Sequence, residues 1–187
     1  MTADEFNTRL IDMNACPVAI EWCSGQTAEH AWATCVRGDW MFWLVGHLLR
    51  DTKPYDPLRA TLIRCAAACV RLHLADKLAN LPTGESLLQL FMVAEAWAAD
   101  PDSVSRKEII VAKKQINTLH KHMNNTLHNY SRQSEAIAII RQLFNSISSI
   151  NAWLELGAPV VYDRIDSAYA DIVRTHYPVC PLLVENE

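Results

Sequence analysis

The chain has 187 residues, a formal net charge of −4 and a composition that is 50% hydrophobic and 20% charged. A chain of this length buries roughly 70% of its unfolded surface, so it needs neither a metal nor a disulfide to fold. Binding to nucleic-acid phosphates requires a basic surface, and the acidic balance argues against direct nucleic-acid binding as the main activity. No apolar run typical of a signal peptide or a membrane span is found, so we expect reduced cysteines in a cytoplasmic protein.

Capping residues predict three short helices near the start of the chain. Thr2 and Glu5 form a capping box, in which each side chain satisfies a backbone N–H of the other residue. Asn14 is expected to cap the second helix, with Pro17 in its first turn, and Thr27 to cap the third. The expected ranges are Ala3 to about Asp12, Asn14 to about Cys23, and Thr27 to about Val36.

The most apolar stretch follows, from Trp40 to Arg50. A helix that is hydrophobic on every side belongs inside a protein, and this one is too short to cross a bilayer. We expect Gly38 to take the left-handed turn that ends the preceding helix. Asp39 is then expected to cap the next helix. The predicted structural core around this helix is Trp32, Gly38, Asp39, Trp40 and Trp43.

The second half of the chain also predicts helices, separated by proline- and glycine-containing breaks. Ser105 and Glu108 form a second capping box, and Ser131 is expected to cap the helix after it. The predicted ranges are Leu58 to Asn80, Leu87 to Ala99, Ser105 to about Asn129, Ser131 to about Leu156, and a last helix containing Val161, Ile165, Ala168, Ile172 and Val173. The buried positions expected on them are Leu62, Cys65, Ala66, Cys69, Leu72, His73, Leu87, Leu90, Phe91, Ala94, Trp97, Ile109, Ala112, Ile116, Leu119, Met123, Ala136, Ile140, Leu143, Ile147, Ile150 and Leu154. The fold class is therefore all-α, with eight or nine helices in one domain over residues 1–187 and a frayed tail from about residue 179.

The sharpest candidate metal ligands are Cys65, Cys69 and His73, which are four residues apart and would stack on successive turns of one helix. Thiolate and imidazole groups suit zinc, and Cys35 or His47 could supply a fourth ligand. Structural zinc sites, however, usually take their ligands from a turn. Small cysteines on an alanine-rich buried face are the alternative explanation, and we expect no bound metal or cofactor.

A basic cluster marks the polar helix that begins at Ser105. Its members are Lys113, Lys114, His120, Lys121 and His128. The helix has more charged and polar side chains than packing requires, which predicts a surface that faces a partner. That surface could touch an acidic protein patch or, more weakly, nucleic acid.

No common catalytic motif is found, neither the zinc-protease H-E-x-x-H nor a P-loop, a dinucleotide-binding G-x-G-x-x-G or a hydrolase G-x-S-x-G. We therefore expect a protein that is not an enzyme. A zinc- or cysteine-dependent helical enzyme using Cys65, Cys69 and His73 remains the alternative from a different class.

Two segments together resemble a helical family that is common in bacteriophages and mobile elements and is often labelled as immunity proteins. The first is Ala31-Trp32, Cys35, Arg37-Gly38-Asp39-Trp40-Met41 and Trp43-Leu44, and the second is Ala170-Asp171-Ile172-Val173-Arg174 with Pro178. Upstream, Ala15-Cys16 and Glu21-Trp22 match the lead-in of the family. The resemblance spans residues 14–178, but residues 103–156 depart from the alanine- and tyrosine-rich repeat of many members.

The resemblance implies a protein that acts in a bacterial host by binding another protein complex. One version is an inhibitor of a host defence complex, as an anti-CRISPR protein is, which acts by sequestration or disassembly. The other version is an immunity protein that neutralises a toxin. The family provides no catalytic residues to transfer to this chain, and the sequence does not indicate an oligomeric state.

Overall fold

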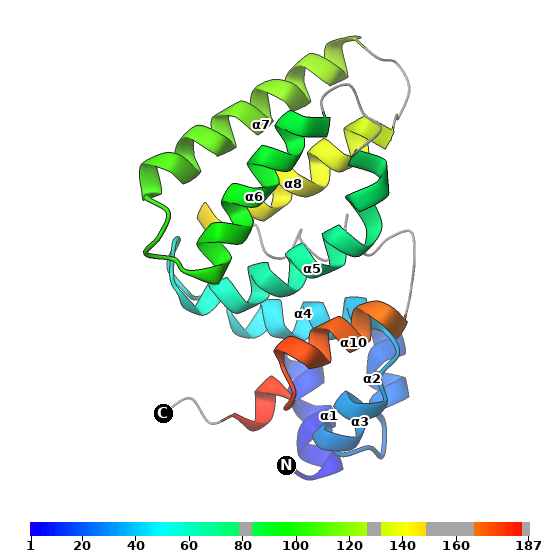
Figure 1. The fold of residues 1–187 in the computed structure, drawn as a ribbon. Helices are drawn as coiled ribbons and strands as arrows, with labels where there is room; N and C mark the ends of the chain where they lie inside the picture. Colours follow the sequence, from blue (N-terminus) through cyan, green and yellow to red (C-terminus); the bar gives the residue numbers. More distant parts are fainter. Residues whose placement is uncertain (79–83, 127–131, 149–166, 185–187) are drawn as a thin grey trace. The chain divides into compact units, whose positions relative to one another are not determined.

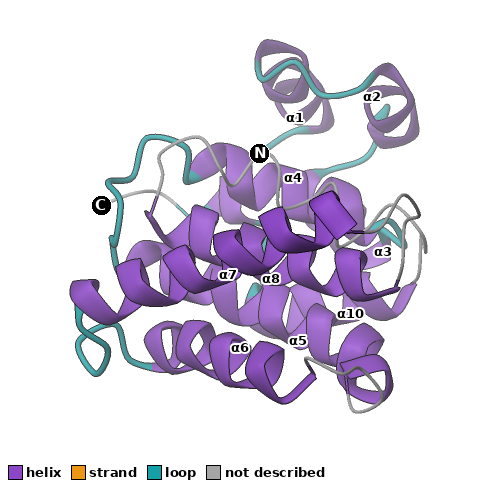
Figure 2. Cartoon of the chain, turned by 90° about the horizontal axis from the view of Figure 1, so that it is seen from above, coloured by secondary structure: helices purple, strands orange, loops and turns teal. Residues whose placement is uncertain are grey.

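The computed structural model describes residues 1–78, 84–126, 132–148 and 167–184 (Figure 1). Side chains are described throughout these ranges except in residues 73–78, 122–126 and 132–135. The chain divides into two compact units, which we call unit 1 (Met1–Leu48 and Arg164–Glu187) and unit 2 (Leu49–Asp163). The described ranges contain nine α-helices and no strand, which confirms the all-α prediction (Figure 2).

Unit 1 is built from short helices contributed by both of its chain segments. They are α1 (Ala3–Asp12), α2 (Pro17–Cys23), α3 (Ala28–Thr34), α4 (Gly38–Leu48), α10 (Ser167–His176) and the one-turn 3-10 helix η2 (Pro181–Leu183). The first capping box is confirmed: the Thr2 N–H donates to Glu5 Oε2 at 2.8 Å, and the Glu5 N–H donates to Thr2 Oγ1 at 3.2 Å. Thr27 caps α3 as predicted.

The predicted cap of α2 is wrong. The residue before α2 is Cys16, whose side chain makes no capping hydrogen bond, and Asn14 instead adopts a left-handed backbone with a φ of 58°. Pro17 explains the difference. It has no N–H to be capped and its ring already fixes a helical φ, so the helix begins there without a side-chain cap. Asparagine is among the few residues that tolerate the left-handed conformation.

Gly38 serves a purpose that differs from the prediction. It is the first residue of α4, and among the described glycines the positive φ belongs to Gly25, so the predicted left-handed turn at Gly38 is wrong. A Cβ at Gly38 would lie 2.6 Å from Tyr169 Cβ and 2.9 Å from the Ala170 backbone N. Gly38 therefore lets α10 pack closely against the start of α4.

Asp39 lies inside the first turn of α4 and so is not the residue that precedes the helix. Its carboxylate accepts two hydrogen bonds from Arg37, of 2.8 Å from Nε and 2.5 Å from Nη2. A negative charge in the first turn is favourable because the N-terminal end of a helix carries partial positive charge. The Arg37 guanidinium also lies 4.6 Å from the ring centroid of Trp40.

The tryptophans of the predicted core differ in burial. Trp32 is only 6% exposed and Gly38 is buried, but Asp39, Trp40 and Trp43 are half-buried. Helix α4 buries Met41, Phe42, Leu44 and Val45 on one face. Trp40 packs against Trp22 with ring centroids 5.9 Å apart. Helix α4 is therefore buried on one face and not on every side as predicted, and Trp40 and Trp43 lie at the edge of the buried face.

Unit 2 contains four long helices. They are α5 (Leu58–Leu78), α6 (Gly84–Ala99), α7 (Arg106–Thr126) and α8 (Arg132–Ser148), and α5 packs on α6 and α8 while α7 packs on α6 and α8. The second capping box is confirmed by hydrogen bonds of 2.8 and 3.2 Å between Ser105 and Glu108. None of the helices in the described ranges has the length and apolar character needed to cross a membrane.

Most predicted core positions of unit 2 are buried. They are Leu62, Cys65, Ala66, Cys69, Leu87, Leu90, Phe91, Ala94, Trp97, Ile109, Ala112, Ile116, Ala136, Ile140, Leu143 and Ile147. Leu72 is an error, because it is 61% exposed, and Leu119 is only half-buried. The predictions for Ser131, Ile150, Leu154, Val161 and Ile165 lie outside the described residues, and the side chains of His73 and Met123 are not among those described.

The described part of the chain ends in a short helix with buried apolar residues. Residues 181–183 form η2, and Cys180 and Leu182 are 2% and 9% exposed. In α10 the buried residues are Tyr169, Ala170 and Val173. Residues 180 and 182 therefore contribute buried apolar side chains, and the frayed tail from about residue 179 stays a prediction.

Candidate functional site

Helices α7 and α8 run antiparallel and face each other with a row of polar side chains between their edges. We call this row the polar seam; its members are Lys113, Asn117 and His120 of α7 and Arg141, Asn145 and Ser148 of α8. All six are half-buried. Members of the seam recur every three, four or seven residues on each helix, which places them on one face.

Hydrogen bonds define the end of the polar seam at Lys113. The Lys113 ammonium donates to Ser148 Oγ at 2.7 Å, and that hydroxyl donates to the Phe144 carbonyl at 2.7 Å. Seven residues along each helix from this pair are His120 and Arg141, so the antiparallel register brings them opposite each other. The charge of Arg141 contributes to lowering the pKa of both Lys113 and His120.

The polar seam is electropositive and partly shielded from water. Burial, and then the nearby charge of Arg141, lower the pKa of Lys113 and also that of His120. Arg141 Nε is buried and has no hydrogen-bond partner. The ion pairs found among the described residues are Arg37–Asp39, Arg50–Asp51, Arg71–Glu95 and Arg174–Asp171. None of them neutralises the polar seam.

A second basic feature lies on the outward face of α7. Lys107, Lys114 and Lys121 are exposed and seven residues apart, and we call them the lysine row. Helix geometry separates neighbouring members by about 10.5 Å along the axis. Ile110 and Val111, which are 38% and 44% exposed, accompany the lysines. Helix α7 as a whole contains five Lys or Arg residues and one Glu.

The basic cluster predicted from the sequence is thus two different features. Lys113 and His120 belong to the polar seam, whereas Lys114 and Lys121 belong to the lysine row. His128 lies outside the described residues. Sequence reasoning missed Lys107, although its seven-residue spacing from Lys114 is visible in the sequence. It also missed Arg141, which has no other Lys or Arg seven residues away on α8 to mark it.

The predicted zinc ligands have the properties of core residues. Cys65 and Cys69 are fully buried, and a hydrogen bond between them, together with burial, raises the pKa of Cys65. The Cys65 thiol therefore stays protonated at neutral pH, whereas metal ligation and nucleophilic attack need the thiolate. The side chain of His73 is not among those described, and no cluster of metal-ligating side chains is found in the part of the chain with described side chains.

The two suggested fourth ligands, Cys35 and His47, belong to unit 1. The Cys35 thiol donates to the Arg37 carbonyl at 3.5 Å, and burial raises its pKa. The ring of His47 lies 5.1 Å from that of Trp43, centroid to centroid.

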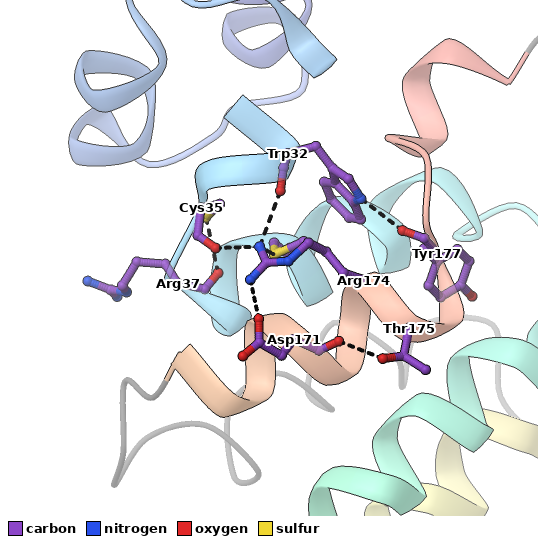
Figure 3. Close-up of polar contacts among 8 residues, drawn as sticks. Trp32, Cys35, Arg37, Asp171, Arg174, Thr175 and Tyr177 are labelled. Atoms are coloured by element: carbon purple, nitrogen blue, oxygen red, sulfur yellow. Dashed lines mark hydrogen bonds and ion pairs between the residues drawn. The ribbon is translucent and has the colours of Figure 1, made fainter. Parts of the chain in front are cut away.

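The two segments that carry the family resemblance meet in unit 1 (Figure 3). Arg174 Nη1 of α10 donates to the carbonyls of Cys35 at 2.7 Å and Trp32 at 3.3 Å, at the end of α3. The Trp32 indole in turn donates to the Tyr177 carbonyl at 2.8 Å, and Arg174 Nη2 donates to Asp171 at 2.6 Å. We call these contacts the clasp. It satisfies carbonyls that the end of a helix leaves without partners.

The clasp joins residues that lie more than 130 positions apart in the sequence. No family model, curated protein or solved structure matches the chain.

Proposed function

We propose that this protein is a non-enzymatic inhibitor that binds an acidic surface of a host defence complex through the lysine row of α7, as an anti-CRISPR protein would. The lysine row is the observation that carries the proposal. An immunity protein that neutralises a toxin would use the same surface, and the identity of the partner separates the two versions.

The described contacts within the protein do not pair the charges of the lysine row with any acidic group. No described ion pair includes Lys107, Lys114 or Lys121, and the row follows one face of the helix over about 21 Å. Complementary charges steer partners together and exclude wrong ones, and a row of lysines fits an acidic surface. The whole chain has a net charge of −4, so the lysine row is a basic surface on an acidic protein.

Apolar side chains beside the lysines support a protein partner. Ile110 and Val111 are exposed on the same helix, and burial of such side chains gives affinity that does not depend on charge. A surface that bound only nucleic-acid phosphates would need the charge alone. The resemblance to proteins of bacteriophages and mobile elements supports a partner in host defence.

The test replaces the three lysines of the row by glutamate in one triple variant. Wild-type protein should restore phage plating on a host protected by the targeted defence system, and the triple variant should lose this effect. The matched control is Lys53→Glu, an exposed lysine outside α7 that should leave inhibition unchanged. Affinity capture from the same host should recover an acidic complex with the wild-type and control proteins only.

Two results would contradict the proposal. One is full inhibition by a correctly folded triple variant, which would remove the lysine row from the interface. The other is wild-type protein that repeatedly returns from the host lysate with nothing but itself, which would remove the inhibitor function.

A further inference from the structure

We propose that Arg106, which is held over the ring of Tyr55, is the residue through which the α7 surface binds a carboxylate side chain of its protein partner. We call Arg106 and Tyr55 together the arginine anchor. The inference rests on the proposed function, because it identifies the contact beside the lysine row that would give the interface its geometry. It also extends the binding surface from α7 to the loop of residues 51–57.

The arginine anchor holds a guanidinium in place without using its hydrogen-bond donors. Arg106 is the first residue of α7, and its guanidinium carbon lies 4.6 Å from the ring centroid of Tyr55. A cation over an aromatic face is attracted to the ring electrostatically, and the N–H donors of arginine remain free to bind an anion. Arg106 is exposed, and its side chain makes no ion pair or hydrogen bond with the residues that the structure describes. The donors of the guanidinium are therefore available to another molecule.

Tyr55 has an unusual backbone conformation for a bulky residue. Its φ is 63°, in the left-handed region, which glycine or asparagine adopts at a lower cost in free energy. The Tyr55 N–H donates to the Ile147 carbonyl at 2.8 Å, in the last turn of α8. Strained residues of this kind persist where their surroundings hold them, and they are concentrated at binding and catalytic sites. What a tyrosine supplies here, and an asparagine would not, is the ring that lies against Arg106.

A buried arginine fixes the loop that carries Tyr55. Arg59 is only 2% exposed, and its guanidinium donates to the Thr52 carbonyl at 2.6 Å and to the Ser146 carbonyl at 2.8 Å. The loop is thus joined to the end of α8 by Arg59 as well as by Tyr55. A side chain that is held in position before binding loses less conformational entropy on binding. The arginine anchor is therefore already ordered in the free protein.

The arginine anchor is continuous with the lysine row. Arg106, Ile110 and Lys114 are exposed and four residues apart, so each lies about 40° further around the helix than the one before. Glu108, the single acidic residue of α7, already accepts hydrogen bonds from the Ser105 N–H and hydroxyl. An acidic segment of a protein fits this surface. The lysines attract it over a distance, and the planar guanidinium can bind one carboxylate through two parallel hydrogen bonds.

The test measures binding of a short, fluorescently labelled poly-glutamate peptide to the full chain by anisotropy. Arg106→Lys keeps the charge but loses the planar fork, and should weaken binding about fivefold to tenfold. The matched control is Arg64→Lys, an exposed arginine on α5, which should bind like the wild type. Because Arg106→Lys changes no charge, its binding should depend on salt as that of the wild type does. Lys114→Met should bind with a weaker salt dependence.

A second set of variants tests whether Tyr55 acts through Arg106. Tyr55→Leu removes the aromatic ring and should weaken peptide binding as much as Arg106→Lys does, whereas Tyr55→Phe keeps the ring and should bind like the wild type. The double variant Tyr55→Leu/Arg106→Lys should bind no more weakly than either single variant, because both changes remove the same contact. Losses that multiply in the double variant would overturn the arginine anchor, as would a Tyr55→Phe variant as weak as Tyr55→Leu.

The same measurements separate failure of this inference from failure of the proposed function. If the triple glutamate variant of the lysine row loses the peptide while Arg106→Lys binds it like the wild type, the lysine row is supported and the arginine anchor is wrong. If the wild-type protein does not bind poly-glutamate, both are wrong. Tighter binding of a single-stranded oligonucleotide of equal charge than of the peptide would overturn the assignment of a protein carboxylate as the ligand.

Discussion

Unit 1 joins its two chain segments by polar contacts to backbone carbonyls, whereas unit 2 is centred on long apolar side chains from four consecutive helices. In unit 1 the clasp brings Arg174 onto α3, and Gly38 allows α10 to approach α4. In unit 2 the side chains of Phe91, Ile116, Ile140 and Phe144 are at most 1% exposed. We therefore expect the stability of unit 1 to depend most on specific contacts and that of unit 2 to depend most on buried apolar area.

The charges of the two units differ as well. Unit 1 contains four Lys or Arg and ten Asp or Glu residues, a net charge of −6, whereas unit 2 contains thirteen and eleven, a net charge of +2. The total of −4 hides this asymmetry. The candidate binding features, the lysine row and the polar seam, both lie in the basic unit, which is why overall composition was a poor guide to them.

The largest effect is expected in the core of unit 2. Phe144→Ala removes a fully buried aromatic ring and should lower the free energy of unfolding by about 3–5 kcal/mol. Val111→Ala, on the exposed side of α7, should change it by less than about 0.5 kcal/mol. Denaturant titration measures both. A loss for Phe144→Ala no larger than that for Val111→Ala would contradict the apolar core of unit 2.

Hydrogen exchange on the Phe144→Ala variant tests whether unit 1 and unit 2 unfold together. The prediction of one folding domain over residues 1–187 requires the slowest amides of both units to lose protection together. Loss of protection confined to unit 2 would show that the units unfold separately.

Alkaline pH should destabilise both units through buried thiols, and Cys23 and Cys180 of unit 1 allow the loss to be calculated. Burial raises the pKa of Cys23 and of Cys180 from 9.0 to about 11. Since the folded state holds these protons more tightly, their contribution to stability is complete below pH 9 and is lost as the pH rises toward 11. By pH 10 the loss should be about 1.4 kcal/mol for each thiol.

Unfolding titrations at pH 7.5 and 10 measure this loss. Cys23→Ala should reduce the difference between the two pH values by the share of one thiol, whatever its effect at pH 7.5. If the variant and the wild type lost stability equally between the two pH values, Cys23 would not be the cause.

The contact between α4 and α10 predicts the next effect. Gly38→Ala places a Cβ too close to Tyr169 and to the backbone of Ala170, and should cost about 1–3 kcal/mol. The matched position is Gly25, which has a φ of 76° and nothing within 4 Å of the point where a Cβ would lie. Gly25→Asn should be tolerated because asparagine adopts the left-handed conformation. Equal tolerance at both positions would mean that Gly38 is not needed for packing.

Local signals in the sequence predicted local structure accurately. The capping boxes at Thr2 and Ser105 involve residues three positions apart, so the sequence contains all of the interaction. The apolar faces of α6 and α8 were predicted for the same reason, since periodicity is visible within one helix. The start of α2 was wrong by a few residues because Pro17 determines it without the help of Asn14.

The sequence could not predict contacts between distant residues. The requirement for glycine at position 38 comes from Tyr169, and the partner of the Trp32 indole is the carbonyl of Tyr177. Nor could it separate Lys113 from Lys114: the two are neighbours, yet one reaches Ser148 of α8 and the other faces solvent. The polar seam becomes visible only when α7 and α8 are placed side by side.

The packing of α10 against Gly38 of α4 has a consequence for the order in which unit 1 can fold during synthesis on the ribosome. Residue 38 is synthesised long before residue 169, and at about 5–20 residues per second the interval is roughly 7–26 s. During that time α4 lacks the neighbour against which its glycine packs, while the helices of unit 2 emerge in succession and can find one another. The segment made first is thus among the last to be completed, and until then the Trp32 indole lacks its acceptor, the Tyr177 carbonyl.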